Sequence, residues 1–444
     1  MQKGVAEIEE IEVVDTQVVQ PRGRTVRTRW GRGLLTFLMV AGPGLIVMVA
    51  DNDAGAVSTY VQAGAQYGTH LLWLLLVLLP TTYFVQEVVA RLGIATGQGH
   101  AAMIYRRFGK WWGRFSLIDL LLVNFLTLVT EFAAIALAFN MMGLPLHAAI
   151  PVAAVGLIAM GVTGSYLRWE RVTLFLCLLD LTWIVIAFVS YPRGGGVMHN
   201  AVVPHMPPGG LTLDLIYLVV AVVGTTIAPW QLFFQQSCVA DKRLRFSDLK
   251  WARLDTFIGA TFTITVAGCM MLVGDVAYRH GIAFSDPAQM AEAIIPVAGY
   301  AVRTGVLLMM VNAAVLGTTA ISLASSWAYG EVMGWPHSLQ KTFKEAPGFY
   351  GVYALSVLAA AGIVMIPGAP LQFIIISVQV LAGLMLPSAI IFLQLLLNDK
   401  ELLGDEFANK RWNNWVNWTI IIVLFALSIV LAAQVLTPEL FKHS

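Results

Sequence analysis

Eleven apolar segments dominate this chain and constrain its fold more than any other feature. A helix needs about 20 mostly apolar residues to cross the hydrocarbon core of a bilayer. Of the 444 residues, 58% are hydrophobic and only 12% are charged, about half the charged share of a soluble domain. We therefore predict an all-α integral membrane protein. The expected spans lie near 34–68, 70–92, 115–140, 146–164, 172–191, 211–240, 256–274, 301–327, 350–367, 370–397 and 415–436.

Lys and Arg residues concentrate in alternate connections between these spans. The loops 144–147 and 190–208 together hold one cation, Arg193. Since cytoplasmic loops carry the excess of Lys and Arg, we expect a plasma-membrane protein with a cytoplasmic N-terminus and, after eleven spans, an extracellular C-terminus. Polar residues 1–33 then form a disordered cytoplasmic tail and 437–444 an extracellular tail. The basic connections lie near 106–114, 168–171, 242–250, 341–344 and 400–411.

Two of the spans are interrupted at corresponding places. The first contains DNDAGA, and the sixth contains GTTIAPWQ, in which Pro229 lacks the backbone donor of a continuous helix. An offset of five spans gives the two halves opposite orientations. We therefore predict an inverted repeat of 34–192 and 211–397, followed by an extra helix at 415–436. Ordinary kinks are the alternative, but matched breaks favour a substrate site at mid-membrane.

Several stretches resemble a known family. The first span reads GPGLIVMVADNDAGAVSTYVQAGAQYGTHLLWLLL, and VARLGIATG, EFAAIALAFN and LPSAIIFLQLLLNDKELLG follow further along the chain. These stretches resemble the Nramp divalent-metal transporters over roughly 34–436. The resemblance implies a LeuT-type fold and alternating access of a transition-metal ion.

The metal-binding motifs depart from the family pattern. Where the family has Asp-Pro-Gly-Asn, this chain has Asp53, Ala54, Gly55 and Ala56; where it has Met-Pro-His, this chain has Ala-Pro-Trp at 228–230. The Asn ligand, the Met thioether and the His are lost. The substitutions resemble the Nramp-related magnesium transporters. Because a thioether favours softer metals, its loss leaves oxygen donors, which suit Mg²⁺ and also Mn²⁺.

The expected metal site combines side-chain and backbone oxygens from both breaks. Asp51 either binds the ion or caps the outer half of the first span, which we expect to start near Val57. Gln379 either contributes its amide or bonds a carbonyl freed by the first break, and Thr225 could instead bond within its own helix. The candidate ligands are Asp53, Asp51, Asn52, Gln379 and the backbone near Ala56 and Thr225. The small side chain of Ala228 belongs to the site because it leaves room for the ion and its water.

Three further residues are expected to line the pathway: Glu131, Trp230 and Gln235. Glu131 matches the family's glutamate in the third span. The positions after the sixth-span break, Trp230, Gln231, Gln235 and Gln236, cannot titrate, and all eight histidines fall in loops, tails or span ends. We therefore expect metal movement without protons, with a proton-coupled Mn²⁺/Fe²⁺ symporter as the alternative.

Other functional classes find less support in the sequence. No His-Glu-x-x-His motif or nucleophile–His pair suggests an enzyme, and no basic tract interleaved with aromatics suggests nucleic-acid binding. An amino-acid symporter would place backbone donors, not Asp51 and Asp53, at the first break. We expect a monomer in the lipid bilayer that has no cofactor and takes Mg²⁺ or Mn²⁺ as its transported substrate.

Overall fold

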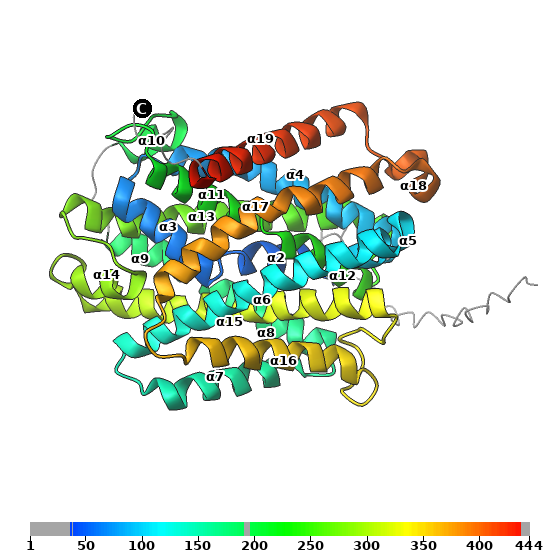
Figure 1. Ribbon diagram of the computed structural model, residues 1–444, viewed down its shortest axis with the longest axis horizontal. Helices are drawn as coiled ribbons and strands as arrows, with labels where there is room; N and C mark the ends of the chain where they lie inside the picture. The colour runs from blue at the N-terminus through cyan, green and yellow to red at the C-terminus, as the bar shows by residue number, and fades with distance from the viewer. Residues whose placement is uncertain (1–35, 38, 191–195, 437–444) are drawn as a thin grey trace, which may run out of the picture. The chain divides into compact units, whose positions relative to one another are not determined.

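All regular elements in the described part of the chain are helices (Figure 1). A computed structural model describes residues 36–37, 39–190 and 196–436. The predicted tails at 1–33 and 437–444 lie outside the described residues. The helices are α2 (Pro43–Ala50), α3 (Ala54–Tyr67), α4 (Leu72–Thr96), α5 (His100–Phe108), α6 (Lys110–Met141), α7 (Leu146–Gly161), α8 (Tyr166–Leu179), α9 (Thr182–Ser190), α10 (Val197–Val202), α11 (Leu213–Thr226), α12 (Pro229–Asp241), α13 (Leu249–Arg279), α14 (Pro287–Ala293), α15 (Ile295–Met333), α16 (Pro347–Val364), α17 (Leu371–Leu397), α18 (Lys400–Phe407) and α19 (Arg411–Leu436), with a 3₁₀ turn, η1, at Phe246–Asp248.

Eight helical segments of the described chain are long and apolar enough to cross a membrane. The helix α7 is apolar but shorter, and each half of the interrupted first span is shorter still. The number of eleven spans therefore stays a prediction. The eight segments are Leu72–Thr96, Lys110–Met141, Tyr166–Ser190, Leu213–Asp241, Phe246–Arg279, Ile295–Met333, Pro347–Val364 and Leu371–Leu397.

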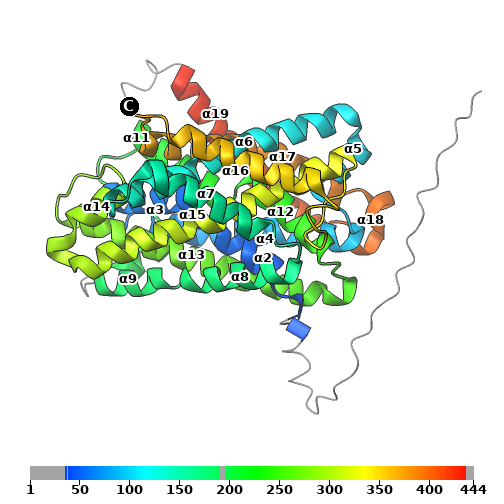
Figure 2. The ribbon, with the colours of Figure 1, turned by 90° about the horizontal axis from the view of Figure 1, so that it is seen from below.

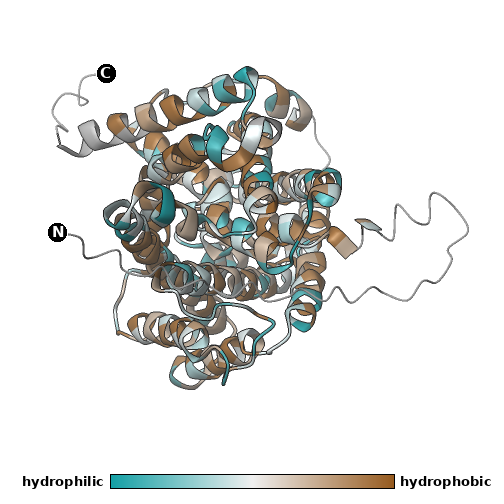
Figure 3. Cartoon of the chain, turned by 90° about the vertical axis from the view of Figure 1, so that its right-hand side faces the viewer, coloured by the Kyte–Doolittle hydropathy of each residue, from teal (hydrophilic) through white to brown (hydrophobic). Residues whose placement is uncertain are grey.

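The long helices run in roughly the same direction and differ in how far neighbouring helices cover them (Figures 1 and 2). The most apolar window of Ile295–Met333 is 83% buried, whereas that of Tyr166–Ser190 is 33% buried. A view along the helices shows hydrophobic residues on the outer helices (Figure 3). Apolar side chains that face outward in this way are expected where lipid is the solvent.

The helix α13 packs closely against both halves of the first span. A Cβ atom added at Gly64 of α3 would lie 2.0 Å from the carbonyl oxygen of Met271, and one at Gly274 of α13 would lie 2.1 Å from that of Val61. Only glycine allows the two backbones to approach this closely. The first break is thereby held against the middle of the bundle.

Candidate metal site

Both predicted breaks are present and lie close to each other. The helix α2 ends at Ala50 and α3 begins at Ala54, while α11 ends at Thr226 and α12 begins at Pro229. The Tyr60 hydroxyl on α3 lies 2.7 Å from the Thr226 hydroxyl oxygen on α11. Each break frees backbone carbonyls of the preceding half-helix from their usual partners.

Asp53 occupies the first position before α3. Its backbone is extended, and its Oδ1 accepts a hydrogen bond of 2.8 Å from the Ala56 backbone N–H. Asp53 is therefore the N-cap of α3. The alternative that Asp51 caps this helix, and the start near Val57, are both wrong, because the helix begins three residues earlier than expected, at Ala54.

Asp51 lies two residues before the cap and is completely buried. Neither of its carboxylate oxygens has a hydrogen-bond partner among the described residues. The Gln231 amide of α12 is the side chain that interacts with it across the gap between the two breaks. With capping excluded, Asp51 is a buried carboxylate that the nearby Gln231 amide satisfies only in part.

Glu131 of α6 brings a third carboxylate to the first break. Its Oε2 accepts a hydrogen bond of 3.1 Å from the Ala54 backbone N–H, and its Oε1 has no partner among the described residues. A Cβ at Gly317 of α15 would lie 2.7 Å from the Glu131 carboxyl and 2.8 Å from Asp53 Cβ. Glu131 and Asp53 therefore pack over the same glycine.

The three buried carboxylates Asp51, Asp53 and Glu131 make no ion pair within the part of the chain that the structure describes. A buried carboxylate without a cation or enough donors is costly, and in a membrane protein such groups face a partner or a pathway. A cation or bound protons must therefore neutralise these groups at the break.

Asn52 points away from these carboxylates. Its Nδ2 lies 3.4 Å from Asp180 Oδ2 and 3.5 Å from the Thr263 carbonyl oxygen. Asp180 follows α8, and the chain resumes as α9 at Thr182, so the fifth span is interrupted as well. Sequence reasoning missed this third interruption, for which the lone carboxylate inside an apolar run was the available signal.

Gln379 of α17 reaches the first break at Gly55. A Cβ at Gly55 would lie 1.6 Å from Gln379 Nε2 and 3.1 Å from Asp53 Oδ1. The amide Nε2 has no hydrogen-bond partner among the described residues. Glycine at position 55 therefore gives the Gln379 amide a place directly beside the Asp53 carboxylate.

At the second break, the possible ligands are backbone carbonyls rather than side chains. Pro229 has no N–H to pair with the Thr225 carbonyl one turn earlier. The Thr225 hydroxyl has no partner among the described residues, whereas Thr226 donates to the Val222 carbonyl of its own helix. Ala228 and Ala56 are both buried and add no polar side chain.

The residues after the second break form a buried row of amides and aromatics. Trp230 packs edge-on against Phe234, with ring centroids 6.0 Å apart. Gln231 Oε1 accepts a hydrogen bond of 2.8 Å from Gln86 Nε2, and Gln235 Nε2 donates to the Thr256 hydroxyl. These two glutamines are therefore fixed by α4 and α13.

His100 at the start of α5 extends this row. Its Nδ1 lies 2.9 Å from Gln236 Oε1. Burial lowers the pKa of His100 to about 4, so the ring is neutral at physiological pH.

Two further buried carboxylates, Asp255 and Glu87, have partners that indicate structural roles. The Asp255 carboxylate of α13 accepts hydrogen bonds from the backbone N–H groups of Gly42 (3.2 Å) and Gly44 (2.8 Å) at the start of α2. Glu87 lies 3.5 Å from Arg91, one turn further along α4, and 2.8 Å from Arg253.

No group of three or more His, Cys, Asp or Glu side chains within the described ranges is arranged as a preformed metal cluster. The donors at the break are instead carboxylates, an amide and freed carbonyls. Such a mixed, oxygen-rich set fits an ion that keeps part of its water shell.

The chain is similar to known transporters along almost its whole length. Residues 44–434 match the family model of natural resistance-associated macrophage protein-like (Nramp) proteins. A protein of Staphylococcus aureus (strain bovine RF122 / ET3-1) called divalent metal cation transporter MntH is 26% identical over 430 residues, which cover 90% of this chain and 91% of that protein.

Two solved structures show the fold. The manganese transporter of Eremococcus coleocola, solved with an aromatic bis-isothiourea compound, matches with a TM-score of 0.76 at 18% identity, covering 98% of this chain and 92% of that one. The nucleobase-cation-symport-1 transporter Mhp1 matches with a TM-score of 0.52 at 12% identity, covering 90% and 94%. The predicted LeuT-type fold is confirmed by these likenesses, and the family match shows that this chain belongs to the Nramp family.

Proposed function

We propose that this chain carries a divalent metal ion across the membrane through the site at Asp53. The observation that carries the proposal is the group of three buried carboxylates, Asp51, Asp53 and Glu131, without a cation among the described residues. The relatives named above are a divalent metal cation transporter and a manganese transporter, which supports the same class of substrate. The two broken spans would give alternating access to this site.

We further propose that Mg²⁺ is a substrate together with Mn²⁺. The residues at 228–230 offer no thioether and no imidazole. Asp53, Asp51, the Gln379 amide and the Thr225 carbonyl are hard oxygen donors, which bind Mg²⁺ and Mn²⁺ rather than softer ions. Small side chains at Ala56 and Ala228 leave room for bound water, which Mg²⁺ retains. Asn52 is the weakest of the candidate ligands, because its amide interacts with Asp180.

The proposed movement does not include a proton. The polar row behind the second break consists of amides and the neutral His100, none of which exchanges protons at physiological pH. One observation favours the alternative of a proton-coupled Mn²⁺/Fe²⁺ symporter: Glu131 lies against Asp53 over Gly317, and two adjacent carboxylates can share a proton.

The deciding experiment is Mg²⁺ uptake into proteoliposomes with the internal pH recorded in parallel. We expect Mg²⁺ entry without acidification, and its loss in Asp53→Ala. The matched control is Asp286→Ala, which removes the N-cap of α14, a helix that contributes no residue to the break. Mn²⁺ entry with acidification and without Mg²⁺ flux would favour the symporter, and Glu131→Gln should then uncouple the two ions.

A further inference from the structure

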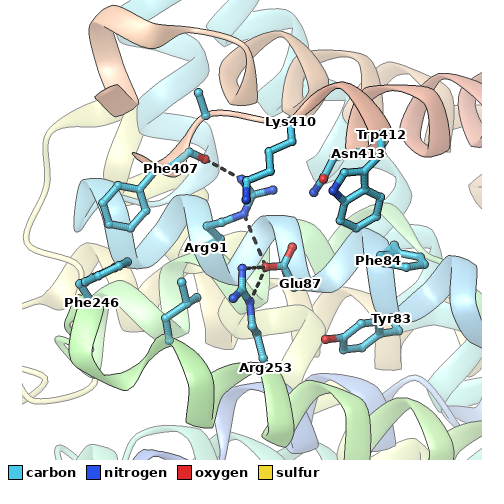
Figure 4. Close-up of a pocket in the computed structure, with 12 residues that line it drawn as sticks. Tyr83, Phe84, Glu87, Arg91, Phe246, Arg253, Phe407, Lys410, Trp412 and Asn413 are labelled. Atoms are coloured by element: carbon cyan, nitrogen blue, oxygen red, sulfur yellow. Dashed lines mark hydrogen bonds and ion pairs between the residues drawn. The ribbon is translucent and has the colours of Figure 1, made fainter. Parts of the chain in front are cut away.

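A second polar cavity lies away from the metal site, between the C-terminal half of α4, the start of α13 and the segment that joins α18 to α19 (Figure 4). Its volume is about 470 Å³, which is in the range of small-ligand sites. Three cationic side chains line it, Arg91, Arg253 and Lys410, and Glu87 is the one carboxylate among its lining residues.

The partners of the arginines in this cavity carry too little negative charge to neutralise them. Arg91 is buried and donates to the Phe407 carbonyl (2.6 Å) and to Asn409 Oδ1 (2.8 Å), both of which are uncharged acceptors. Arg253 donates to the same Glu87 oxygen that lies 3.5 Å from Arg91 Nε. One carboxylate is therefore shared by two guanidinium groups.

Lys410 adds a third positive charge on the other side of the cavity. It extends from the chain before α19 toward Arg91 (Figure 4). Its ammonium makes no ion pair with any side chain that the structure describes. The described lining thus has an excess of positive charge around an open space, which a bound anion would balance.

Aromatic side chains make up most of the remaining lining, which also includes Leu249, Ala408 and Asn413. Phe246 and Trp412 are each about half exposed, at 51% and 53%. Phe84 packs edge-on against Trp412, and Tyr83 against Phe257, whose ring is 51% exposed on α13. Aromatic side chains of this kind are typical of the membrane–water interface. A ligand here would meet cations at one end and an apolar surface at the other.

The connections that border the cavity, η1 with the start of α13 and the segment before α19, belong to the basic connections whose Lys and Arg content predicts the cytoplasmic side. We infer that the cavity binds the phosphate headgroup of an anionic phospholipid of that leaflet, with the acyl chains along the exposed aromatic rings. Basic pockets between membrane helices recognise lipid headgroups in this way. A soluble phosphate shares the headgroup chemistry but has no apolar part that would contact the aromatic surface.

The test is native mass spectrometry of the full chain released from nanodiscs of phosphatidylcholine with a minority of phosphatidylglycerol. We expect the wild-type chain to retain phosphatidylglycerol and the Arg253→Gln/Lys410→Gln variant to retain about tenfold less. The matched control, Arg114→Gln/Lys344→Gln, removes the same charge from two exposed side chains outside the cavity and should retain the lipid as the wild type does.

Two outcomes would overturn the inference. Equal retention by the cavity variant and the control would show that the cations act only through net charge. Displacement of phosphatidylglycerol by millimolar inorganic phosphate would assign the cavity to a soluble anion instead. If loss of the Arg253–Glu87 pair unfolds the double variant, Lys410→Gln alone decides, because that pair is intact in it; we expect about threefold lower retention.

Discussion

Gly55 shows how one missing side chain shapes the candidate metal site. Its Cα faces the Gln379 amide and the Asp53 carboxylate at distances that leave no room for a methyl group. Gly156 of α7, in contrast, has nothing within 4 Å of an added Cβ. The two glycines therefore form a matched pair, one inside the site and one outside it.

We expect Gly55→Ala to lower the free energy of unfolding by about 1–3 kcal/mol, because the new methyl displaces the Gln379 amide. Gly156→Ala should be neutral or stabilise the chain by up to about 1 kcal/mol. Thermal unfolding in detergent measures both. Gln379→Ala should restore stability to Gly55→Ala, and similar melting temperatures for the two single variants would contradict the close approach.

Ala228 is the residue at which the choice of metal can be tested. Introducing a thioether with Ala228→Met should raise the preference for Mn²⁺ or Cd²⁺ over Mg²⁺ by about tenfold, because a soft donor then joins the oxygen ligands. Competition binding measures the ratio. Ala228→Leu is the control, since it adds similar volume without sulfur. If the Leu variant shifts the preference as much as the Met variant, the soft-ligand explanation fails.

The broken helices are the features that the sequence predicted best at the level of elements. DNDAGA places carboxylates, an amide and a glycine in the first span, and Pro229 interrupts the sixth, so both breaks have local chemical causes. The interruption between α8 and α9 has neither proline nor glycine, since the chain there reads LLDLT. Its only local signal is the lone carboxylate of Asp180, whose partner Asn52 is far away in the sequence.

Contacts between segments far apart in the sequence could not be predicted either. The Gly55–Gln379 approach and the packing of Glu131 over Gly317 each join helices that no local pattern relates. The sequence left open whether Asp51 binds the ion or caps the helix, since Asp51 and Asp53 are chemically alike and only the backbone conformation identifies Asp53 as the cap.

Asp255 stabilises the start of a helix and is not a candidate metal ligand. Its carboxylate, on the neighbouring α13, caps α2. We expect Asp255→Asn to cost about 1 kcal/mol of stability and to weaken Mn²⁺ binding several-fold, since a neutral amide holds the start of α2 less firmly. Asp286→Asn is the control, because Asp286 caps α14 through the N–H groups of Ala288 and Gln289.

Both cap variants should melt at lower temperature, and only Asp255→Asn should change the affinity for Mn²⁺. Calorimetry with Mn²⁺ separates the two effects. An unchanged affinity in Asp255→Asn would show that α2 does not need this cap to keep the site.

For the whole molecule, the orientation in the membrane follows from the distribution of Lys and Arg and stays a prediction. Met198 of α10 is 80% exposed in a loop expected outside the cell, and Lys344 is exposed in a loop expected in the cytoplasm. The native Cys177 and Cys238 are buried, and Cys269 is partly exposed on the apolar helix α13.

We expect a membrane-impermeant thiol reagent to label Met198→Cys in intact cells and Lys344→Cys only after permeabilisation. The unsubstituted chain reports the background from the native cysteines. Labelling of Lys344→Cys in intact cells would reverse the orientation and place the α4–α13–α19 cavity in the opposite leaflet.

The double glycine contact between α3 and α13 has a mechanical consequence. With Gly64 against the Met271 carbonyl and Gly274 against the Val61 carbonyl, neither helix can slide or rotate past the other without a backbone collision. We therefore expect the two to move together during a transport cycle. A pair of spin labels on α3 and α13 should therefore report a constant separation in every state, and could serve as the fixed reference against which the movement of other helices is measured.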